Sequence, residues 1–321
     1  MLEDAIIKVE HLSHRYDVQW AVRDVNFEIT QKGIYGLLGS NGAGKSTIMN
    51  IICGVIKPTE GVVLVKGTDI TRDPTGVKCH IGFLPQKPPL YDELTVEEYL
   101  THAAELRCVP DREVKEAVSD VMGLCAISHF RTRLIKNLSG GYQQRVGIAQ
   151  AIIHKPDIVI FDEPTNGLDP NQILDIRRLI KGIAEEHTVI LSTHILSEVQ
   201  AICDYIFMID AGQVGFNGSV NDIDNYILPS TIYVDSTEEI PGDKLKHIPG
   251  VLQVEHVEKN RYRIRFSDAN EVMEHLVEEA AANCWHMCEM RLEKISLDHV
   301  FAELSKKKRS SKLKTKIMGI I

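Results

Sequence analysis

The sequence has no run of about 18–20 consecutive apolar residues, so we expect no transmembrane helix. Its first residues, Met1–Asp4, are acidic and lead into no apolar stretch of the kind found in secretory signals, so we do not expect secretion. The seven cysteines form no Cys-x-x-Cys pair, which leaves zinc and thioredoxin-like chemistry without support. Reduced cytosolic thiols are the simplest interpretation of this scattered, odd-numbered set.

The charge is unevenly distributed along the 321 residues, whose formal net charge is −9. Residues 306–321 hold seven Lys or Arg and no acidic residue, so the first 305 residues alone carry a formal charge of −16. A globular body this acidic does not resemble a nucleic-acid binder, and we expect no nucleic-acid partner. The basic tail is either a solvated chain end or a segment that contacts anionic lipid head groups.

The pattern of apolar residues indicates two domains. Residues 5–228 alternate strand-like and helix-like segments, which is typical of an α/β domain. Residues 229–305 have the predicted order strand, helix, strand, strand, helix, strand, followed by a last helix near 296–305. The first six elements have the order of a ferredoxin-like split β-α-β unit. We therefore expect domains at 1–228 and 229–305, and a basic tail at 306–321.

A glycine-rich stretch after the strand-like residues 33–38 fits the pattern G-x-x-x-x-G-K-[ST]. Glycines let the backbone approach a ligand closely, and the start of the following helix directs N–H groups and a positive dipole end at an anion. Lys45 would reach the β- and γ-phosphates of a nucleotide, and the Ser46 hydroxyl would bind Mg²⁺. The predicted ATP-binding residues of this loop are Gly39, Ser40, Asn41, Gly42, Ala43, Gly44, Lys45, Ser46 and Thr47.

The apolar stretch 158–161 ends in two carboxylates, Asp162 and Glu163. A buried strand holds its end rigidly, so both side chains would be well placed. Asp162 would hold Mg²⁺ through water, and Glu163 would polarise the attacking water as a general base. On its own the pair would equally suit a solvated strand end before the turn at Pro164. Behind a phosphate loop, the catalytic interpretation is favoured.

The sequence Leu-Ser-Gly-Gly-Tyr-Gln-Gln-Arg at 138–145 opens a helix with one serine and two glycines, which suits a second anion site. It resembles the signature motif of the ABC ATPases and, as in that family, comes before the Asp-Glu strand. The resemblance implies that two copies pack head to tail, each ATP lying between the phosphate loop of one copy and the signature of the other. The signature residues are Ser139, Gly140, Gly141 and Tyr142. Tyr142 stands where the family usually has Gln, and Ser40 stands where Pro is more common.

The same resemblance implies roles for four further residues. Gln86 looks like the Q-loop glutamine, which contacts Mg²⁺ or water beside the surface where the membrane subunit docks. His194 looks like the switch histidine that senses the γ-phosphate and orients water. Asp169 looks like the D-loop residue at the dimer interface, and Tyr16 looks like the aromatic residue that stacks on adenine.

The resemblance spans about residues 5–220 and implies a P-loop ABC ATPase cassette with a helical subdomain at about 88–150, followed by the small α+β ferredoxin-like domain. It implies a subunit that binds ATP and Mg²⁺ and hydrolyses ATP. A homodimer or heterodimer of such subunits would drive a separate transmembrane permease from the cytoplasmic face of the cell membrane. The implied catalytic residues are Glu163, His194, Lys45 and Gln86, and the implied metal-binding residues are Ser46, Gln86 and Asp162.

Residues 295–304 bear on the direction of transport. Their sequence, Ile-Ser-Leu-Asp-His-Val-Phe-Ala-Glu-Leu, resembles the Ser-Leu-Glu-Asp-Val-Phe ending of ABC-2 type export ATPases of the sodium, drug-resistance and gliding-motility groups. The resemblance favours an exporter. An importer ATPase with a regulatory C-terminal domain remains an alternative, as does a soluble ABC ATPase without a transport role. The chain has one compact cassette and no heptads, which counts against the soluble machines.

Overall fold

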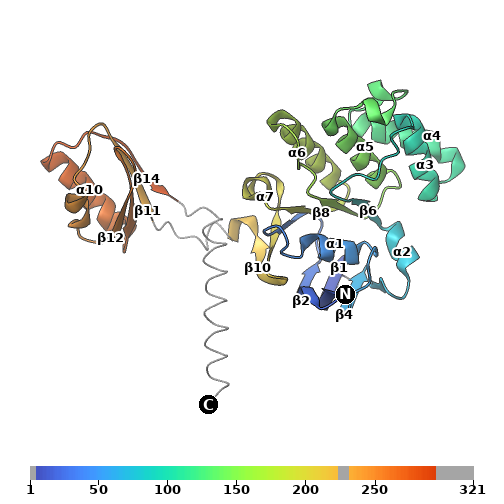
Figure 1. Cartoon of the computed structure of the whole chain (residues 1–321), viewed down its shortest axis with the longest axis horizontal. Coiled ribbons are helices and arrows are strands. Elements are labelled where there is room, and N and C mark those ends of the chain that lie inside the picture. Colours follow the sequence, from blue (N-terminus) through green and yellow to red (C-terminus); the bar gives the residue numbers. More distant parts are fainter. Residues whose placement is uncertain (1–4, 223–230, 294–321) are drawn as a thin grey trace, which may run out of the picture. The chain divides into compact units, whose positions relative to one another are not determined.

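The structure is a computed structural model of the chain and describes residues 5–222 and 231–293. Two compact units divide between Val220 and Asn221 (Figure 1). The predicted domain boundary at 228–229 lies in a stretch outside the described residues. The predicted helix at 296–305, the export-type motif at 295–304 and the basic tail also lie outside them.

A mostly parallel sheet is the centre of the first unit, with strand order β10-β9-β3-β8-β7-β6. Five strands run parallel and β10 pairs antiparallel with β9. The strands are β3 (Ile34–Leu38), β6 (Ile81–Leu84), β7 (Ile158–Asp162), β8 (Thr188–Thr193), β9 (Tyr205–Asp210) and β10 (Gln213–Ser219). Every residue of β3, β7 and β8 is buried, as expected for parallel strands covered on both faces. The predicted α/β organisation is confirmed.

A second, antiparallel sheet has the strand order β2-β1-β4-β5. Its strands are β1 (Ile7–Tyr16), β2 (Gln19–Ile29), β4 (Glu60–Val65) and β5 (Thr68–Asp69). Helix α1 (Lys45–Ile52) contacts strands of both sheets and lies between them (Figure 1). Its side chains Ile48, Ile51 and Ile52 are buried in the shared core, where each stabilises the fold by about 1.5–3 kcal/mol. This packing fixes the helix that follows the phosphate loop.

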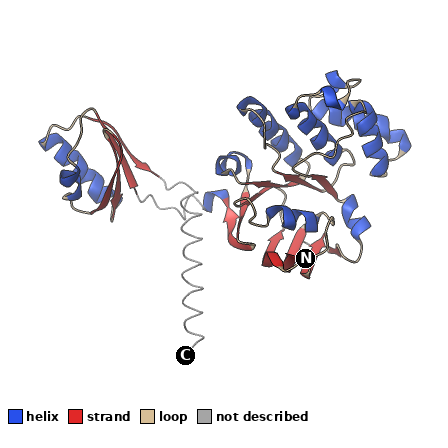
Figure 2. Ribbon diagram, viewed as in Figure 1, coloured by secondary structure: helices blue, strands red, loops and turns tan. Residues whose placement is uncertain are grey.

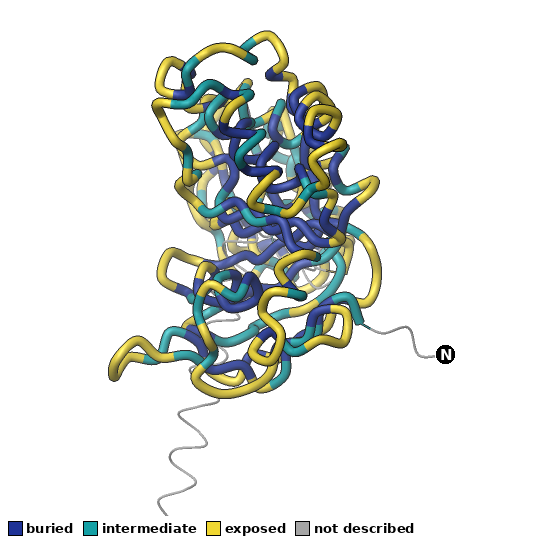
Figure 3. The backbone as a smooth tube through the Cα atoms, turned by 90° about the vertical axis from the view of Figure 1, so that its right-hand side faces the viewer, coloured by how far each residue is buried: buried dark blue, intermediate teal, exposed yellow. Residues whose placement is uncertain are grey.

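Most of the other helices of this unit cover the opposite face of the parallel sheet (Figure 2). They are α3 (Val96–Leu106), α4 (Asp111–Leu124), α5 (Gly140–Ile152), α6 (Pro170–Ala184) and α7 (Leu196–Ile202), with short 3-10 turns at Ser128–Phe130 and Ile135–Asn137. Helix α2 (Pro74–Cys79) instead contacts β6, at the edge of the parallel sheet, and β5 of the antiparallel sheet. Helices α3, α4 and α5 pack on one another within the range expected for a helical subdomain. A reciprocal capping box between Thr95 and Glu98 starts α3. Figure 3 shows the buried residues gathered along the central strands.

The second unit has the predicted order of strand, helix, strand, strand, helix, strand. Its elements are β11 (Thr231–Ser236), α9 (Gly242–Lys246), β12 (Val251–Glu258), β13 (Arg261–Phe266), α10 (Ala269–Ala282) and β14 (Met287–Glu293). The sheet is antiparallel with the order β12-β13-β11-β14. Its core unites strand and helix residues, among them Ile232, Ile264, Leu245 and Leu276. Among the helices of the two described ranges, none is long and apolar enough to cross a membrane.

Candidate nucleotide-binding site

The phosphate loop joins the end of β3 to the start of α1, as the motif predicted. Gly42 and Gly44 have φ angles of 79° and 108°, in the left-handed region that favours glycine. A Cβ atom on Gly39 would lie 2.5 Å from the carbonyl oxygen of Ile209, and one on Gly44 would lie 2.6 Å from a methyl group of Val22. The loop therefore needs glycine at these places to pass so close to its neighbours.

Lys45 is a buried cation at the first position of α1. Its Nζ donates hydrogen bonds to the carbonyl oxygens of Gly39 (2.8 Å) and Ser40 (3.2 Å), and it lies 3.8 Å from Oε1 of Glu163. Burial lowers the pKa of Lys45, while the carboxylates of Glu163 and Asp162 oppose that shift. A cation held inside the loop, next to free N–H groups at a helix start, suits a polyphosphate.

Glu163 follows β7 in a left-handed conformation, with a φ angle of 48°, which is uncommon for a residue other than glycine. Its Oε1 lies 3.1 Å from Nδ1 of His194. Its Oε2 accepts hydrogen bonds from Nε2 of Gln86 (3.3 Å) and Nδ2 of Asn166 (3.4 Å). One carboxylate thus contacts three other polar side chains, and such a group can orient a water molecule as a general base.

Asp162, the last residue of β7, is buried and paired with Ser192 of β8 in the sheet register. The Ser192 hydroxyl donates to Oδ1 of Asp162 and accepts the N–H of Glu163 at 2.9 Å. Ser192 therefore ties the end of β7 to β8. No cluster of three or more Cys, His, Asp or Glu in the described part of the chain could hold a metal alone. Asp162 and Ser46 offer oxygen ligands, which fits Mg²⁺ bound jointly with substrate phosphates.

One cavity of about 630 Å³ brings Lys45, Gln86, Glu163 and His194 together, whereas the predicted residues Gly39, Ser40, Ala43 and Asp162 are not part of its lining. It is lined by Ala21, Asn41, Gly42, Gly44, Lys45, Ser46, Thr47, Gln86, Glu163, Asn166 and His194. The sequence prediction missed Ala21, Asn166 and Ser192. Asn166 had a usable signal, because it lies three positions after the general-base candidate in a turn. Ser192 also had a usable signal, because it is a polar residue that directly follows the apolar run 189–191. Nothing in the sequence pointed to Ala21.

The signature residues lie outside the lining of this cavity. Ser139 is the exposed N-cap of α5, and its side chain makes no capping hydrogen bond. A Cβ atom on Gly141 would lie 2.6 Å from Oε1 of Gln172, so that side chain would have to move. Tyr142 packs edge-on against Phe130, with ring centroids 4.6 Å apart. The tyrosine that replaces the usual glutamine thus has a packing role in the helical region.

Two other predicted residues also lie apart from the cavity lining. Tyr16 is 51% exposed at the end of β1, where its ring meets that of His14 edge-on at 4.7 Å. Asp169 is the N-cap of α6, and its Oδ1 accepts the backbone N–H groups of Asn171 and Gln172, each at 3.0 Å. Gly140 opens α5 beside Ser139, with open space around its Cα. Within one copy of the chain, these residues do not join the phosphate loop.

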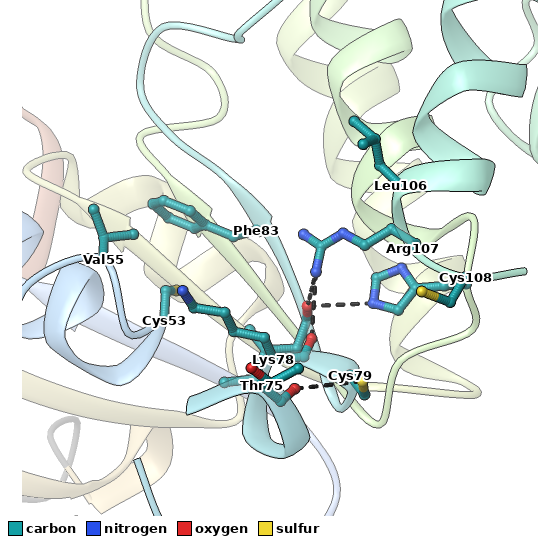
Figure 4. Close-up of a pocket in the computed structure, with 11 residues that line it drawn as sticks. Cys53, Val55, Thr75, Lys78, Cys79, Phe83, Leu106, Arg107 and Cys108 are labelled. Carbon is teal, nitrogen blue, oxygen red and sulfur yellow. Dashed lines mark hydrogen bonds between the residues drawn. The ribbon is translucent and has the colours of Figure 1, made fainter. Parts of the chain in front are cut away.

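A second cavity, of about 420 Å³, lies between α2, β6 and the end of α3 (Figure 4). It is lined by Cys53, Val55, Thr75, Lys78, Cys79, Ile81, Phe83, Leu106, Arg107, Cys108 and His154, with no carboxylate among them. Arg107 donates to the carbonyl oxygens of Lys78 and Ile81, both at 3.3 Å. Val55 and Leu106 are 60% and 67% exposed. The cavity thus combines cationic groups with exposed apolar side chains.

Comparisons with known proteins find the same family over the first unit and over most of the chain. A family model described as ABC transporter matches residues 22–166. The chain is 38% identical over 205 residues to the ABC transporter ATP-binding protein NatA of Bacillus subtilis (strain 168), covering 63% of this chain and 83% of NatA. It is 28% identical over 305 residues to the linearmycin resistance ATP-binding protein LnrL of the same organism, covering 94% and 98% respectively.

The fold is also similar to that of solved structures. One is the dimeric structure of MJ0796, a bacterial ABC transporter cassette, with a TM-score of 0.61 and 27% sequence identity. That similarity covers 67% of this chain and 98% of the MJ0796 chain. The shared part therefore has the extent of a single cassette, and about a third of the present chain lies beyond it.

Proposed function

The chain belongs to the ABC transporter family as an ATP-binding, ATP-hydrolysing subunit, and we propose that it powers an exporter through ATP-driven closure of a dimer. The observation that carries the proposal is the single cavity in which Lys45, Gln86 and His194 surround the carboxylate of Glu163. Phosphoryl transfer to water needs positioning and charge neutralisation more than covalent chemistry. These four side chains offer both.

In the proposed reaction each side chain has a separate task. Lys45 and the loop N–H groups hold the phosphates of ATP and neutralise their charge. Glu163 takes a proton from the attacking water, while His194 and Gln86 hold the Glu163 carboxylate in place. Ser46 and Asp162 would hold Mg²⁺, with Gln86 beside it, and the bound ion would supply neutralisation of the negative charge that develops on the phosphates. The adenine would stack on Tyr16, whose ring is available at the end of β1.

A head-to-tail dimer would complete the site. Ser139 is exposed at the start of α5 and its side chain makes no capping hydrogen bond, so its hydroxyl is available to a second copy of the chain. Gly140 leaves open space there, Gly141 follows it in α5, and Tyr142 packs against Phe130 of its own subunit. Asp169 would lie at the same interface. This sequence contains both halves of such a site, the phosphate loop and the signature residues, which favours a homodimer over a heterodimer.

The second cavity is the proposed docking place of a transmembrane permease subunit, at the cytoplasmic face of the cell membrane. Strand β6 begins at Ile81 beside the cavity and leads through Leu84 towards Gln86, which donates to Glu163. A partner bound in this cavity could therefore shift β6 and with it Gln86, which contacts the catalytic Glu163. Lys78 and Arg107, with exposed Val55 and Leu106, suit a partner helix that carries apolar residues and a carboxylate.

Export is the direction that the similarities favour. LnrL, by its name a resistance protein, matches this chain over both units, and the motif at 295–304 resembles export ATPases. We further propose that the second unit is a ferredoxin-like accessory domain. Its antiparallel strand order β12-β13-β11-β14, with two helices in its core, supports this. An importer ATPase with such a regulatory domain is the second candidate.

Affinity capture of the full chain from its native membranes in mild detergent tests the transport proposal. We expect a stoichiometric polytopic membrane protein, whose own sequence would separate export from import. Capture of only soluble, ribosomal or DNA-bound partners would contradict the transport role and leave the ATPase assignment unaffected. Capture by a chain carrying Lys45→Ala serves as the control for partners held only through bound ATP.

A further inference from the structure

Glu198 is a buried carboxylate outside the cavity lining. It lies on α7 and is only 3% exposed. Each of its oxygens accepts one hydroxyl: Oε1 accepts that of Thr165, and Oε2 accepts that of Thr193 at 2.6 Å. A guanidinium nitrogen of Arg177, on α6, lies 3.9 Å from Oε1. Burying a carboxylate is costly unless its oxygens are satisfied, and here the two threonines and the arginine satisfy them.

The directions of these hydrogen bonds follow from their neighbours. The hydroxyl oxygen of Thr193 accepts the backbone N–H of Ile195 at 3.0 Å. The hydroxyl proton of Thr193 is therefore available for Glu198, which as a carboxylate can only accept. Thr165 likewise donates to the other oxygen. Glu198 thus holds two hydroxyls, one on each oxygen: Thr165 belongs to the loop after β7, and Thr193 is the last residue of β8.

These two threonines are sequence neighbours of the catalytic pair, Glu163 and His194. Thr165 comes two positions after Glu163, and Thr193 comes directly before His194. The side chains of Glu163 and His194 meet at 3.1 Å, and both residues line the cavity. Ser192 makes the only other described side-chain bridge between the end of β7 and β8. Glu198 therefore fixes the loop after β7 to the end of β8 from behind the catalytic pair.

We propose that Glu198 is a positioning residue of the ATPase reaction, which sets the distance between Glu163 and His194 through Thr165 and Thr193. The inference rests on the proposed function of that pair. A role in packing alone would need only an apolar side chain of similar volume at position 198. Glu198 instead accepts one hydroxyl on each carboxylate oxygen, and such hydrogen bonds fix the positions of Thr165 and Thr193. Catalytic rates are sensitive to small changes in the position of the reacting groups.

The test compares kcat and KM for ATP of the full chain with those of Glu198→Gln, Thr165→Val and Thr193→Val. Glutamine keeps the volume of Glu198 but replaces one acceptor oxygen by a donor group, so one threonine hydroxyl must reverse its role and accept, which changes the geometry of that contact. Valine keeps the shape of threonine and removes the hydroxyl. We expect kcat to fall by about tenfold in each variant, with KM for ATP changed by less than about twofold.

Three controls separate positioning from packing. Thr165→Ser keeps the hydroxyl and should retain near wild-type kcat. Thr188→Val alters a buried threonine at the opposite end of β8, and it should leave kcat unchanged. The double variant Thr165→Val with Glu198→Gln should lose no more activity than the more affected single variant, because both changes act on the same contact.

The outcomes distinguish this inference from the proposed function. Wild-type kcat in Thr165→Val and Glu198→Gln, alongside an inactive Glu163→Gln, would overturn the role of Glu198 and leave the ATPase site intact. An equal loss in Thr165→Ser and Thr165→Val would also overturn it, because the hydroxyl would not matter. A wild-type chain without ATPase activity would overturn both. If thermal unfolding shows that Glu198→Gln does not fold, the two Thr165 variants decide the question.

Discussion

Nδ1 of His194 lies 3.1 Å from Oε1 of Glu163, although the two residues are 31 positions apart in the chain. The contact follows from the sheet, because β7 and β8 are adjacent parallel strands and their carboxyl ends meet at one edge. Ligands of open α/β sheets bind outside these carboxyl ends. The same edge receives Lys45 at the start of α1, so the buried core determines the arrangement of the site.

Replacing Glu163 by glutamine should slow ATP hydrolysis by at least about 100-fold while ATP still binds, because general-base catalysis contributes about 10²–10⁴-fold. Glutamine keeps the shape of the side chain but cannot take the proton. Because hydrolysis is what opens the proposed dimer, we expect this variant to accumulate as a closed dimer with ATP. Steady-state ATPase assays and gel filtration with ATP measure both effects.

The exposed Glu116 on α4 offers a matched control for that experiment. The change Glu116→Gln removes the same charge from the chain far from the cavity lining and should leave turnover and dimerisation unchanged. Wild-type turnover in Glu163→Gln would remove Glu163 from its assigned role, whatever the control does.

Lys45→Ala should weaken ATP binding by about 10- to 150-fold, since a hydrogen bond to a charged group contributes about 1.5–3 kcal/mol. The Lys45 ammonium is the cation that lies inside the phosphate loop, held by two of its carbonyl groups. Isothermal titration of the full chain with ATP measures the affinity. Lys57→Ala, at an exposed position after α1, is the control, and equal losses in both variants would contradict a specific phosphate contact.

The sequence predicted the elements and the site residues that depend on local signals. The phosphate loop was recognisable because its glycines and lysine have fixed spacing, and the structure places that loop between β3 and α1 as expected. Glu163 was recognisable as a carboxylate at the end of an apolar stretch that follows a phosphate loop in the sequence, whereas His194 was recognisable only through the family resemblance. Their meeting depends on strand order, which no local pattern specifies.

Long-range contacts explain what the sequence could not predict. The cavity around Arg107 joins residues from five separate stretches of the first unit, so no short motif marks it. Glu198 looks like an ordinary polar residue of a short helix until its threonine partners are known. Tyr142 was recognisable only as a departure from the usual glutamine, and its contact with Phe130 is visible only in the folded chain.

His154 should make the stability of the chain depend on pH. Burial, and next the positive charge of Arg107, lower the pKa of His154 to about 4 from its usual 6.5. The unfolded chain therefore binds a proton before the folded chain does. The resulting stabilisation is fully present above pH 6.5 and is lost as the pH falls towards 4. After allowance for partial exposure we expect about 2 kcal/mol for this loss.

Urea unfolding at pH 7 and at about pH 4.5, half a unit above the shifted value, checks this effect. His154→Gln keeps an amide donor for the carbonyl of Ile81 but does not titrate, so its free energy of unfolding should fall less on acidification than that of the wild type. His129→Gln, at an exposed position, should retain the wild-type pH dependence. A parallel fall in the wild type and His154→Gln would contradict the prediction.

Arg107→Glu should abolish capture of the membrane partner without lowering the ATPase activity of the isolated chain. The change reverses the charge of the cavity, so a partner carboxylate would be repelled rather than bound. Arg112→Glu introduces the same change at an exposed position of α4 and should leave capture intact. Co-purification in detergent decides the matter, and unchanged capture by Arg107→Glu would place the docking surface elsewhere.

Two inactive variants of the chain should restore ATP hydrolysis when they are mixed, if each site is shared between two copies. A dimer of Lys45→Ala chains has no intact phosphate loop, and a dimer of Ser139→Arg chains has a blocked signature in every site. In the mixed dimer, one site combines the unaltered phosphate loop of the Ser139→Arg copy with the unaltered signature of the Lys45→Ala copy. The exposed, uncapped position of Ser139 makes this pairing sterically available.

The control mixes Lys45→Ala chains with chains that carry both changes, a combination in which no site is intact. Turnover in the first mixture alone would require that one ATP contacts both copies, because neither copy contains a functional site of its own. Activity in Ser139→Arg chains by themselves would mean that the cavity beside Lys45 is sufficient without a partner. The exposed serine at the start of α5 would then have no part in the reaction, and closure of a dimer could not be its driving step.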